Sequence, residues 1–202
     1  MFIAQAYKAL HEFWRYLVGS VLIIIASVIG QIPLTLAILG KLWMDNDGNP
    51  EELGDAMGSL DQATLMGVLD KNLTLFLMLL SFVFALGGVF LAVKYLHQQK
   101  MKDIITTRKK FDWGRVWFAF IMITIYTIGT TLLSYFMAPE EFEVTFNLIP
   151  FLILCVVAIL FVPIQTSVEE FVFRGYLMQG FGILAKNRWF PLVMTSFIFG
   201  GL

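Results

Sequence analysis

Four long apolar stretches, separated by polar segments, dominate the sequence. They cover residues 13–39, 73–96, 113–137 and 148–165. Crossing the hydrocarbon core of a bilayer takes about 20 apolar residues in a helix. Lipid offers no partners to backbone N–H and C=O groups, so a span is either a helix or part of a closed barrel. The apolar stretches lack the period-two alternation of barrel strands, and we therefore predict four transmembrane helices.

A fifth apolar run begins at Trp189 and continues for 14 residues to Leu202. Because 14 residues do not cross a bilayer, we interpret this run as the first part of a truncated helix. The expected fold is all-α, a polytopic transmembrane helical bundle with four full spans and a truncated fifth. We treat residues 1–202 as a single transmembrane domain. Residues 1–12 are expected to form an amphipathic segment at the membrane interface.

The composition supports a membrane protein and excludes a soluble domain. Hydrophobic residues make up 58% of the chain and charged residues 14%, whereas soluble domains contain about 25% charged residues. Of the 14 Lys and Arg residues, 12 fall on one side of the predicted spans. By the positive-inside rule, this side and the N-terminus are cytoplasmic. The basic segment 94–115 accordingly predicts membrane lipids as partners, and no nucleic acid.

One group of ionisable residues lies next to a predicted span and carries candidate chemistry. Glu169, Glu170 and Arg174 continue the fourth helix among apolar neighbours. Glu170 and Arg174 have the i, i+4 spacing that favours an ion pair. Glu169 is one residue too far from Arg174 for this contact and is left without an obvious local partner, so it is the candidate general base on a water. Pro163 is expected to interrupt the helical hydrogen bonds and make room for water.

Two other adjacent glutamate pairs provide an internal control for this pattern. Glu51-Glu52 and Glu140-Glu141 lie in acidic loops, and neither has an arginine four residues after its second glutamate. The pair at 169 and 170 is therefore the one that combines a correctly spaced arginine with an apolar setting.

At these residues the sequence resembles the CPBP family of intramembrane proteases, which includes CAAX prenyl endopeptidases and bacteriocin-processing or self-immunity proteins. The family motif Glu-Glu-x-x-x-Arg is matched by Glu169, Glu170 and Arg174. The second motif, Phe-x-x-x-His, begins at Phe199, and its histidine is absent from the sequence. The resemblance implies an endopeptidase that hydrolyses peptide bonds near the cytoplasmic membrane face. Glu169 would activate water, the Glu170–Arg174 pair would support it, and a peptide or protein, in some members prenylated, would be the substrate.

The histidines of this sequence are His11 and His97, and both are expected to be interfacial rather than catalytic. We therefore interpret the chain as the N-terminal part of a longer, C-terminally truncated protease domain, with its motif region at 165–202, and expect it to be inactive alone. Its metal ligands are unknown, and a divalent metal is the one cofactor that stays open. The expected location is a bacterial cell membrane, which the chain crosses several times.

A second hypothesis belongs to another class of protein. In a non-catalytic membrane protein, such as an immunity or transport component, Glu170 and Arg174 would form a structural ion pair that holds helices together.

Overall fold

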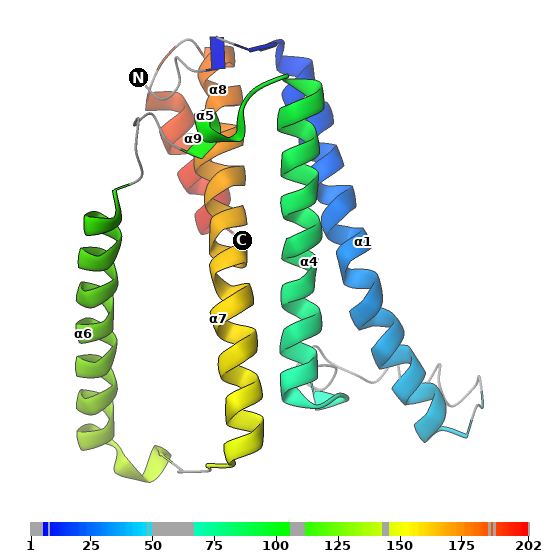
Figure 1. Ribbon diagram of the computed structural model, residues 1–202, viewed down its shortest axis with the longest axis vertical. Helices are drawn as coiled ribbons and strands as arrows, with labels where there is room; N and C mark the ends of the chain where they lie inside the picture. The colour runs from blue at the N-terminus through cyan, green and yellow to red at the C-terminus, as the bar shows by residue number, and fades with distance from the viewer. Residues whose placement is uncertain are drawn as a thin grey trace. The chain divides into compact units, whose positions relative to one another are not determined.

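A computed structural model describes residues 6–7, 9–47, 49, 67–105, 112–142, 146–185, 187 and 189–201 of the chain, and among these it contains helices and no strand. Four stretches are long and apolar enough to cross a membrane. This result confirms an all-α polytopic bundle with four spans (Figure 1). The long helices are α1 (Phe13–Asp45), α4 (Lys71–Leu91), α6 (Trp113–Met137) and α7 (Leu148–Glu170).

Shorter elements extend or connect these helices. They are the π-helix η2 (Ala92–Leu96), α5 (Met101–Ile105), the 3₁₀-helix η3 (Pro139–Glu141), the π-helix η4 (Phe171–Leu177), α8 (Met178–Ala185) and α9 (Trp189–Gly200). The fourth span passes without a break from α7 through η4 into α8 and is 38 residues long. Helix α7 also continues through Pro163, and the hydroxyl groups of Thr166 and Ser167 donate hydrogen bonds to the Pro163 carbonyl oxygen at 3.2 and 2.6 Å.

The chain divides into two compact units. The first contains Met1–Thr107 and Leu152–Leu202, and the second contains Arg108–Phe151. In the first unit, α1 and α4 run antiparallel, packed together where α1 begins and diverging toward its end (Figure 1). Gly88 makes this packing close, because a Cβ atom there would lie 2.8 Å from the Cβ of Ala26. Small residues at such contacts let helix backbones approach each other in a membrane.

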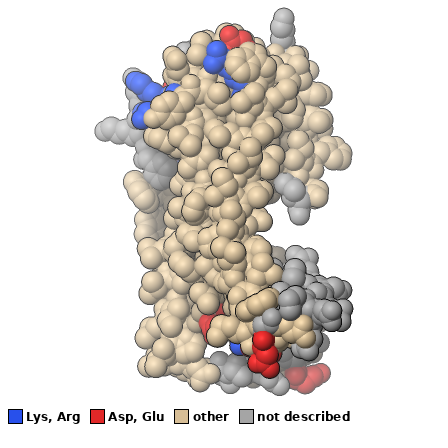
Figure 2. All heavy atoms as spheres, turned by 90° about the vertical axis from the view of Figure 1, so that its right-hand side faces the viewer, with Lys and Arg blue, Asp and Glu red and all other residues tan. Residues whose placement is uncertain are grey.

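Charged residues lie at the two ends of the α1–α4 pair. Arg15 and Lys94 belong to one end, where α1 starts and η2 follows α4, and the Lys41–Asp45 ion pair and Asp70 belong to the other. Figure 2 shows this face, with Lys and Arg gathered at one end, Asp and Glu mainly at the other, and uncharged side chains between them. The orientation in the membrane stays a prediction. Several charges that support it lie outside the described residues: Lys8, Glu51, Glu52, Asp55, Asp61, Arg108, Lys109, Lys110, Glu143, Lys186 and Arg188.

The hydrophobic core of the first unit lies at the end of the α1–α4 pair where α1 begins. It joins the start of α1 to η2, α5 and η4, so the segment that carries the motif arginine is packed against residues from the first half of the chain. Its buried members are Tyr16, Ile23, Val89, Ala92, Val93, Ile104 and Tyr176.

Candidate active site

The ion pair expected from the sequence is present where α7 passes into η4. An Nη1 atom of Arg174 lies 3.2 Å from Oε2 of Glu170. The side chain of Arg174 is 69% exposed and that of Glu170 is 48% exposed. Exposed pairs of this kind contribute about 0.2–1 kcal/mol to folding. The pair therefore holds the two side chains together without being a major source of stability.

Glu169 has a local partner, which corrects the expectation that it has none. Nε2 of Gln165 donates a hydrogen bond to Oε1 of Glu169 at 3.2 Å. The contact has the same i, i+4 spacing as the ion pair, but it runs from Glu169 back along α7 and not forward to Arg174. A carboxylate has about four acceptor positions. The single hydrogen bond from Gln165 therefore orients the carboxylate of Glu169 and leaves its other acceptor positions available to a water or a substrate.

The motif crosses a change in helix type that the sequence analysis did not predict. Residues Phe171–Leu177 form a π-helix, whose hydrogen bonds reach one residue further than those of an α-helix. Such turns are rare and frequently occur at functional sites. Gly175 lies within this turn, and a Cβ atom there would be 2.3 Å from Cγ2 of Ile104. A glycine inside an apolar helix was the one signal in the sequence for this close contact.

All four site residues expected from the sequence border one hollow of about 390 Å³. Sites for small ligands typically measure about 300–1,000 Å³. Phe199 reaches the hollow from α9, and its ring packs edge-on against Phe173 with the ring centroids 5.3 Å apart. The lining residues are Glu169, Glu170, Phe173, Arg174, Met178, Leu192, Thr195, Ser196, Phe199 and Gly200.

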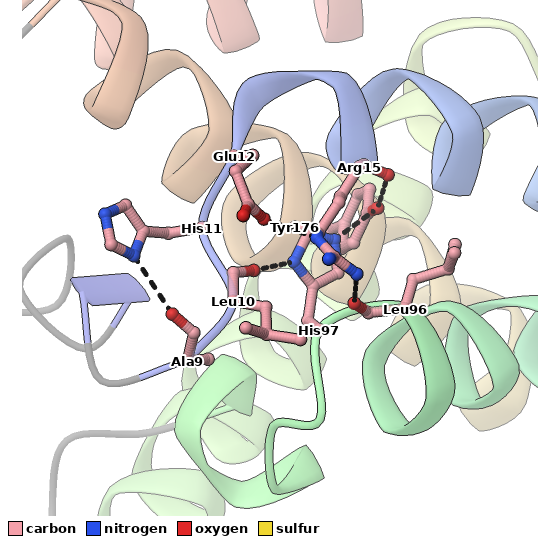
Figure 3. Close-up of polar contacts among 8 residues, drawn as sticks. All are labelled: Ala9, Leu10, His11, Glu12, Arg15, Leu96, His97 and Tyr176. Atoms are coloured by element: carbon pink, nitrogen blue, oxygen red, sulfur yellow. Dashed lines mark hydrogen bonds and ion pairs between the residues drawn. The ribbon is translucent and has the colours of Figure 1, made fainter.

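The two histidines differ from each other and do not line this hollow. His11 is exposed, as expected. His97 is only 1% exposed, so it packs inside the protein and does not face solvent. Nδ1 of His97 lies 2.7 Å from the carbonyl oxygen of Leu10, and Nε2 lies 2.9 Å from the hydroxyl oxygen of Tyr176 (Figure 3). These partners are 87 and 79 residues away in the chain, which explains why local patterns did not reveal them.

The described residues include no group of three or more His, Cys, Asp or Glu side chains that could hold a metal ion. Glu169 and Glu170 are the two acids that line the hollow, and Glu170 is paired with Arg174. These residues do not form a complete metal site, and we assign no metal ligand among them.

Paired glutamates, a spaced arginine and apolar walls lie together where α7 passes into η4. Residues 147–202 match the family model described as type II CAAX prenyl endopeptidase Rce1-like, which confirms the resemblance expected from Glu169, Glu170 and Arg174.

A relative from a bacterium extends the similarity to the rest of the chain. The chain is 34% identical over 190 residues to the uncharacterized protein YyaK of Bacillus subtilis (strain 168). The alignment covers 94% of this chain and 60% of the relative, so the chain spans about 60% of the length of the curated relative it matches. No solved structure matches the chain.

Proposed function

We propose that this chain supplies the water-activating base of an intramembrane endopeptidase that cleaves peptide bonds near the cytoplasmic membrane face. The observation that carries the proposal is the joint position of Glu169, Glu170, Arg174 and Phe199 on one hollow. The family of residues 147–202 supports the same reaction class. Its substrate would be a peptide or protein, with prenylated chains as one subclass, and its location a bacterial cell membrane.

Glu169 is the group best placed to act as the base. Its carboxylate borders the hollow and accepts a hydrogen bond from Gln165, which fixes its orientation. In the proposed reaction, Glu169 removes a proton from water while the water oxygen attacks the carbonyl carbon of the scissile bond. The proton then passes to the leaving nitrogen as the tetrahedral intermediate collapses into a carboxylate and an amine. A general base of this kind typically contributes a factor of 10²–10⁴ to the rate.

Glu170 and Arg174 have a supporting role in this proposal. Their ion pair keeps the second carboxylate engaged, so that Glu169 is the acid free to meet water. The guanidinium of Arg174 also borders the hollow and stays largely exposed. Phe173, Leu192 and Phe199 supply apolar walls that suit the side chains of a membrane-associated peptide.

The test is a cleavage assay in proteoliposomes with the full-length protein that carries this chain. Prenylated and unprenylated peptides that end in a CAAX sequence serve as probes. We expect Glu169→Gln to lower cleavage about 10²–10⁴-fold, since glutamine cannot accept the proton of water. Glu140→Gln is the matched control, because Glu140 also belongs to an adjacent glutamate pair but is exposed beyond α6. It should cleave like the parent.

The same variants separate the proposal from a non-catalytic role. If Glu169→Gln leaves cleavage and the cellular phenotype intact while Glu170→Ala unfolds the protein, the charged cluster is structural. In that case the protein is an immunity or transport component, and the enzymatic proposal is wrong.

A further inference from the structure

The side of η4 that faces the start of α1 contains a buried polar cluster that the proposed chemistry does not use. His97 and Tyr176 are each 1% exposed, and their side chains meet at 2.9 Å. The Tyr176 hydroxyl also lies 3.2 Å from the carbonyl oxygen of Arg15. Figure 3 shows the imidazole between the Leu10 carbonyl and the Tyr176 ring, with Arg15 beside it.

Counting protons fixes the direction of these hydrogen bonds. The carbonyl oxygen of Leu10 can only accept, so Nδ1 of His97 is the nitrogen that carries a proton. In a neutral imidazole Nε2 is then an acceptor, and the hydroxyl of Tyr176 donates to it. The neutral form of His97 therefore holds Leu10 by one nitrogen and Tyr176 by the other.

Protonation of His97 would reverse the hydrogen bond to Tyr176 without breaking it, so its cost lies in the charge that it buries. Nε2 would become a donor, so the Tyr176 hydroxyl would turn its own proton to the Arg15 carbonyl oxygen. The new cation would also be buried next to the guanidinium of Arg15, which donates from Nη1 to the carbonyl oxygen of Leu96 at 2.8 Å. Among the described residues, the titratable or charged groups that face His97 are Glu12, Arg15 and Tyr16 at the start of α1, and Tyr176 on η4.

The balance of these groups favours the neutral form. Burial lowers the pKa of His97, and the charge of Arg15 lowers it further. The hydrogen bond to Leu10 and the charge of Glu12 act in the opposite direction and are weaker than burial. By linkage, acid favours any opening of the structure that brings His97 into water.

Other contacts hold the same side of η4 and α8. Nε2 of Gln179 donates to the carbonyl oxygen of Asp103 at 3.1 Å, and Nε2 of Gln99 donates to Oε1 of Gln179 at 3.3 Å. Ile104 fills the space in front of Gly175. Residues 97–105 thus bind one side of η4 and α8, while Arg174 on η4 borders the open hollow. π-helical turns are rare within α-helices, and these contacts outside the turn are the ones that can stabilise it.

From this geometry we infer that His97 is a positioning residue for η4, that it acts through Tyr176, and that protonation of His97 loosens its hold. A histidine outside the motif would then determine the position of the π-helical turn and of Arg174 within it. The inference concerns the position of η4 and can be tested without measuring peptide cleavage.

Hydrogen exchange of the amides of residues 171–177 reports directly how firmly η4 is held in place. It is measured in nanodiscs and corrected for the intrinsic effect of pH. We expect protection at pH 5 to be about fivefold lower than at pH 7.5 in the parent protein. His11→Gln is the control, because His11 is exposed and hydrogen-bonds only the nearby Ala9 carbonyl among the described contacts. It should show the same pH dependence as the parent.

Two substitutions of His97 separate its two hydrogen bonds. Glutamine extends to the position of Nε2 and can accept from Tyr176, so His97→Gln should keep protection near the parental value at pH 7.5 and lose the pH dependence. Asparagine reaches only the position of Nδ1, so His97→Asn should lower protection of η4 at every pH. Tyr176→Phe, which keeps the ring and removes only the hydroxyl, should lower it in the same way.

The inference is overturned by any of three results. One is full protection of η4 in both His97→Asn and Tyr176→Phe. Another is unchanged acid sensitivity in His97→Gln, which would assign the titration to a different group. The third is a His97 that stays neutral down to pH 4 in NMR spectra of the ¹⁵N-histidine-labelled protein, with His11 as the internal reference for titration.

Discussion

The two sides of η4 show how one helical segment can be firmly anchored and chemically open at once. On one side, Tyr176 is 1% exposed and is held by His97, and the carbonyl oxygen of Arg15 lies 3.2 Å from its hydroxyl. On the other side, Arg174 is 69% exposed and meets Glu170 at the border of a hollow. Both residues have polar partners. The buried His97–Tyr176 contact fixes the position of η4, whereas the exposed Glu170–Arg174 pair faces potential ligands. The stability that a polar contact contributes depends on how deeply it is buried, so the number of polar contacts alone does not predict stability.

The strongest test of this difference is truncation of the anchored side. Tyr176→Ala removes a buried ring and leaves the His97 imidazole and the Arg15 carbonyl without the hydroxyl. We expect the free energy of unfolding to fall by about 3–5 kcal/mol, as for other large aromatic residues in cores. Thermal unfolding in detergent measures the loss. A decrease under 1 kcal/mol would show that the anchored side is no more important than the open one.

Filling the narrowest contact on the anchored side should have a smaller effect. In Gly175→Val, the added Cβ would lie 2.3 Å from Cγ2 and 3.1 Å from the carbonyl oxygen of Ile104, so the Ile104 side chain or the η4–α5 contact must shift. Overpacking of this kind typically costs about 1–3 kcal/mol. Gly87→Val is the control, because nothing lies within 4 Å of a Cβ at that glycine. The same unfolding assay should show the larger loss for Gly175→Val.

Acid should weaken the anchored side alone. Because burial lowers the pKa of His97 in the folded protein, the unfolded chain binds more protons than the folded one below about pH 6.5. The stabilisation from neutral His97 is therefore fully present above that pH and is lost as the pH falls toward the lowered pKa. The loss is at most about 1.4 kcal/mol per pH unit. Comparing the unfolding of the parent with that of His97→Gln between pH 5 and 7.5 isolates this contribution.

The smallest change is expected on the open side. Arg174→Met keeps the length of the side chain and removes the ion pair with Glu170. We expect the free energy of unfolding to change by less than about 1 kcal/mol, because the pair is exposed and screened by solvent. A loss as large as that of Tyr176→Ala would mean that both sides of η4 are structural. It would also favour the non-catalytic role of the charged cluster.

The sequence was informative wherever a short spacing decides a contact. The four spans follow from their apolar lengths, and the Glu170–Arg174 pair follows from its i, i+4 spacing. The same i, i+4 spacing relates Gln165 to Glu169, so the hydrogen bond between them could also have been predicted from the sequence.

Contacts between distant parts of the chain could not be read from the sequence in the same way. His97 looked like an interfacial residue because it follows an apolar span and precedes a basic segment. Its burial depends on Leu10 and Tyr176, which local periodicity does not relate to it. The π-helical segment η4 and the following α8 pack against residues 97–105, and intrinsic helix propensity contains no information about that packing.

The order of these partners along the chain affects how the protein can assemble as it is synthesised. Every residue described above as holding the anchored side of η4 lies between positions 10 and 105, and η4 begins at position 171. Chains emerge from the ribosome N-terminus first, at about 5–20 residues per second. The complementary surface for Tyr176 and Gln179 therefore exists before the motif helix is made. The π-helical turn can dock onto that surface as it leaves the insertion machinery.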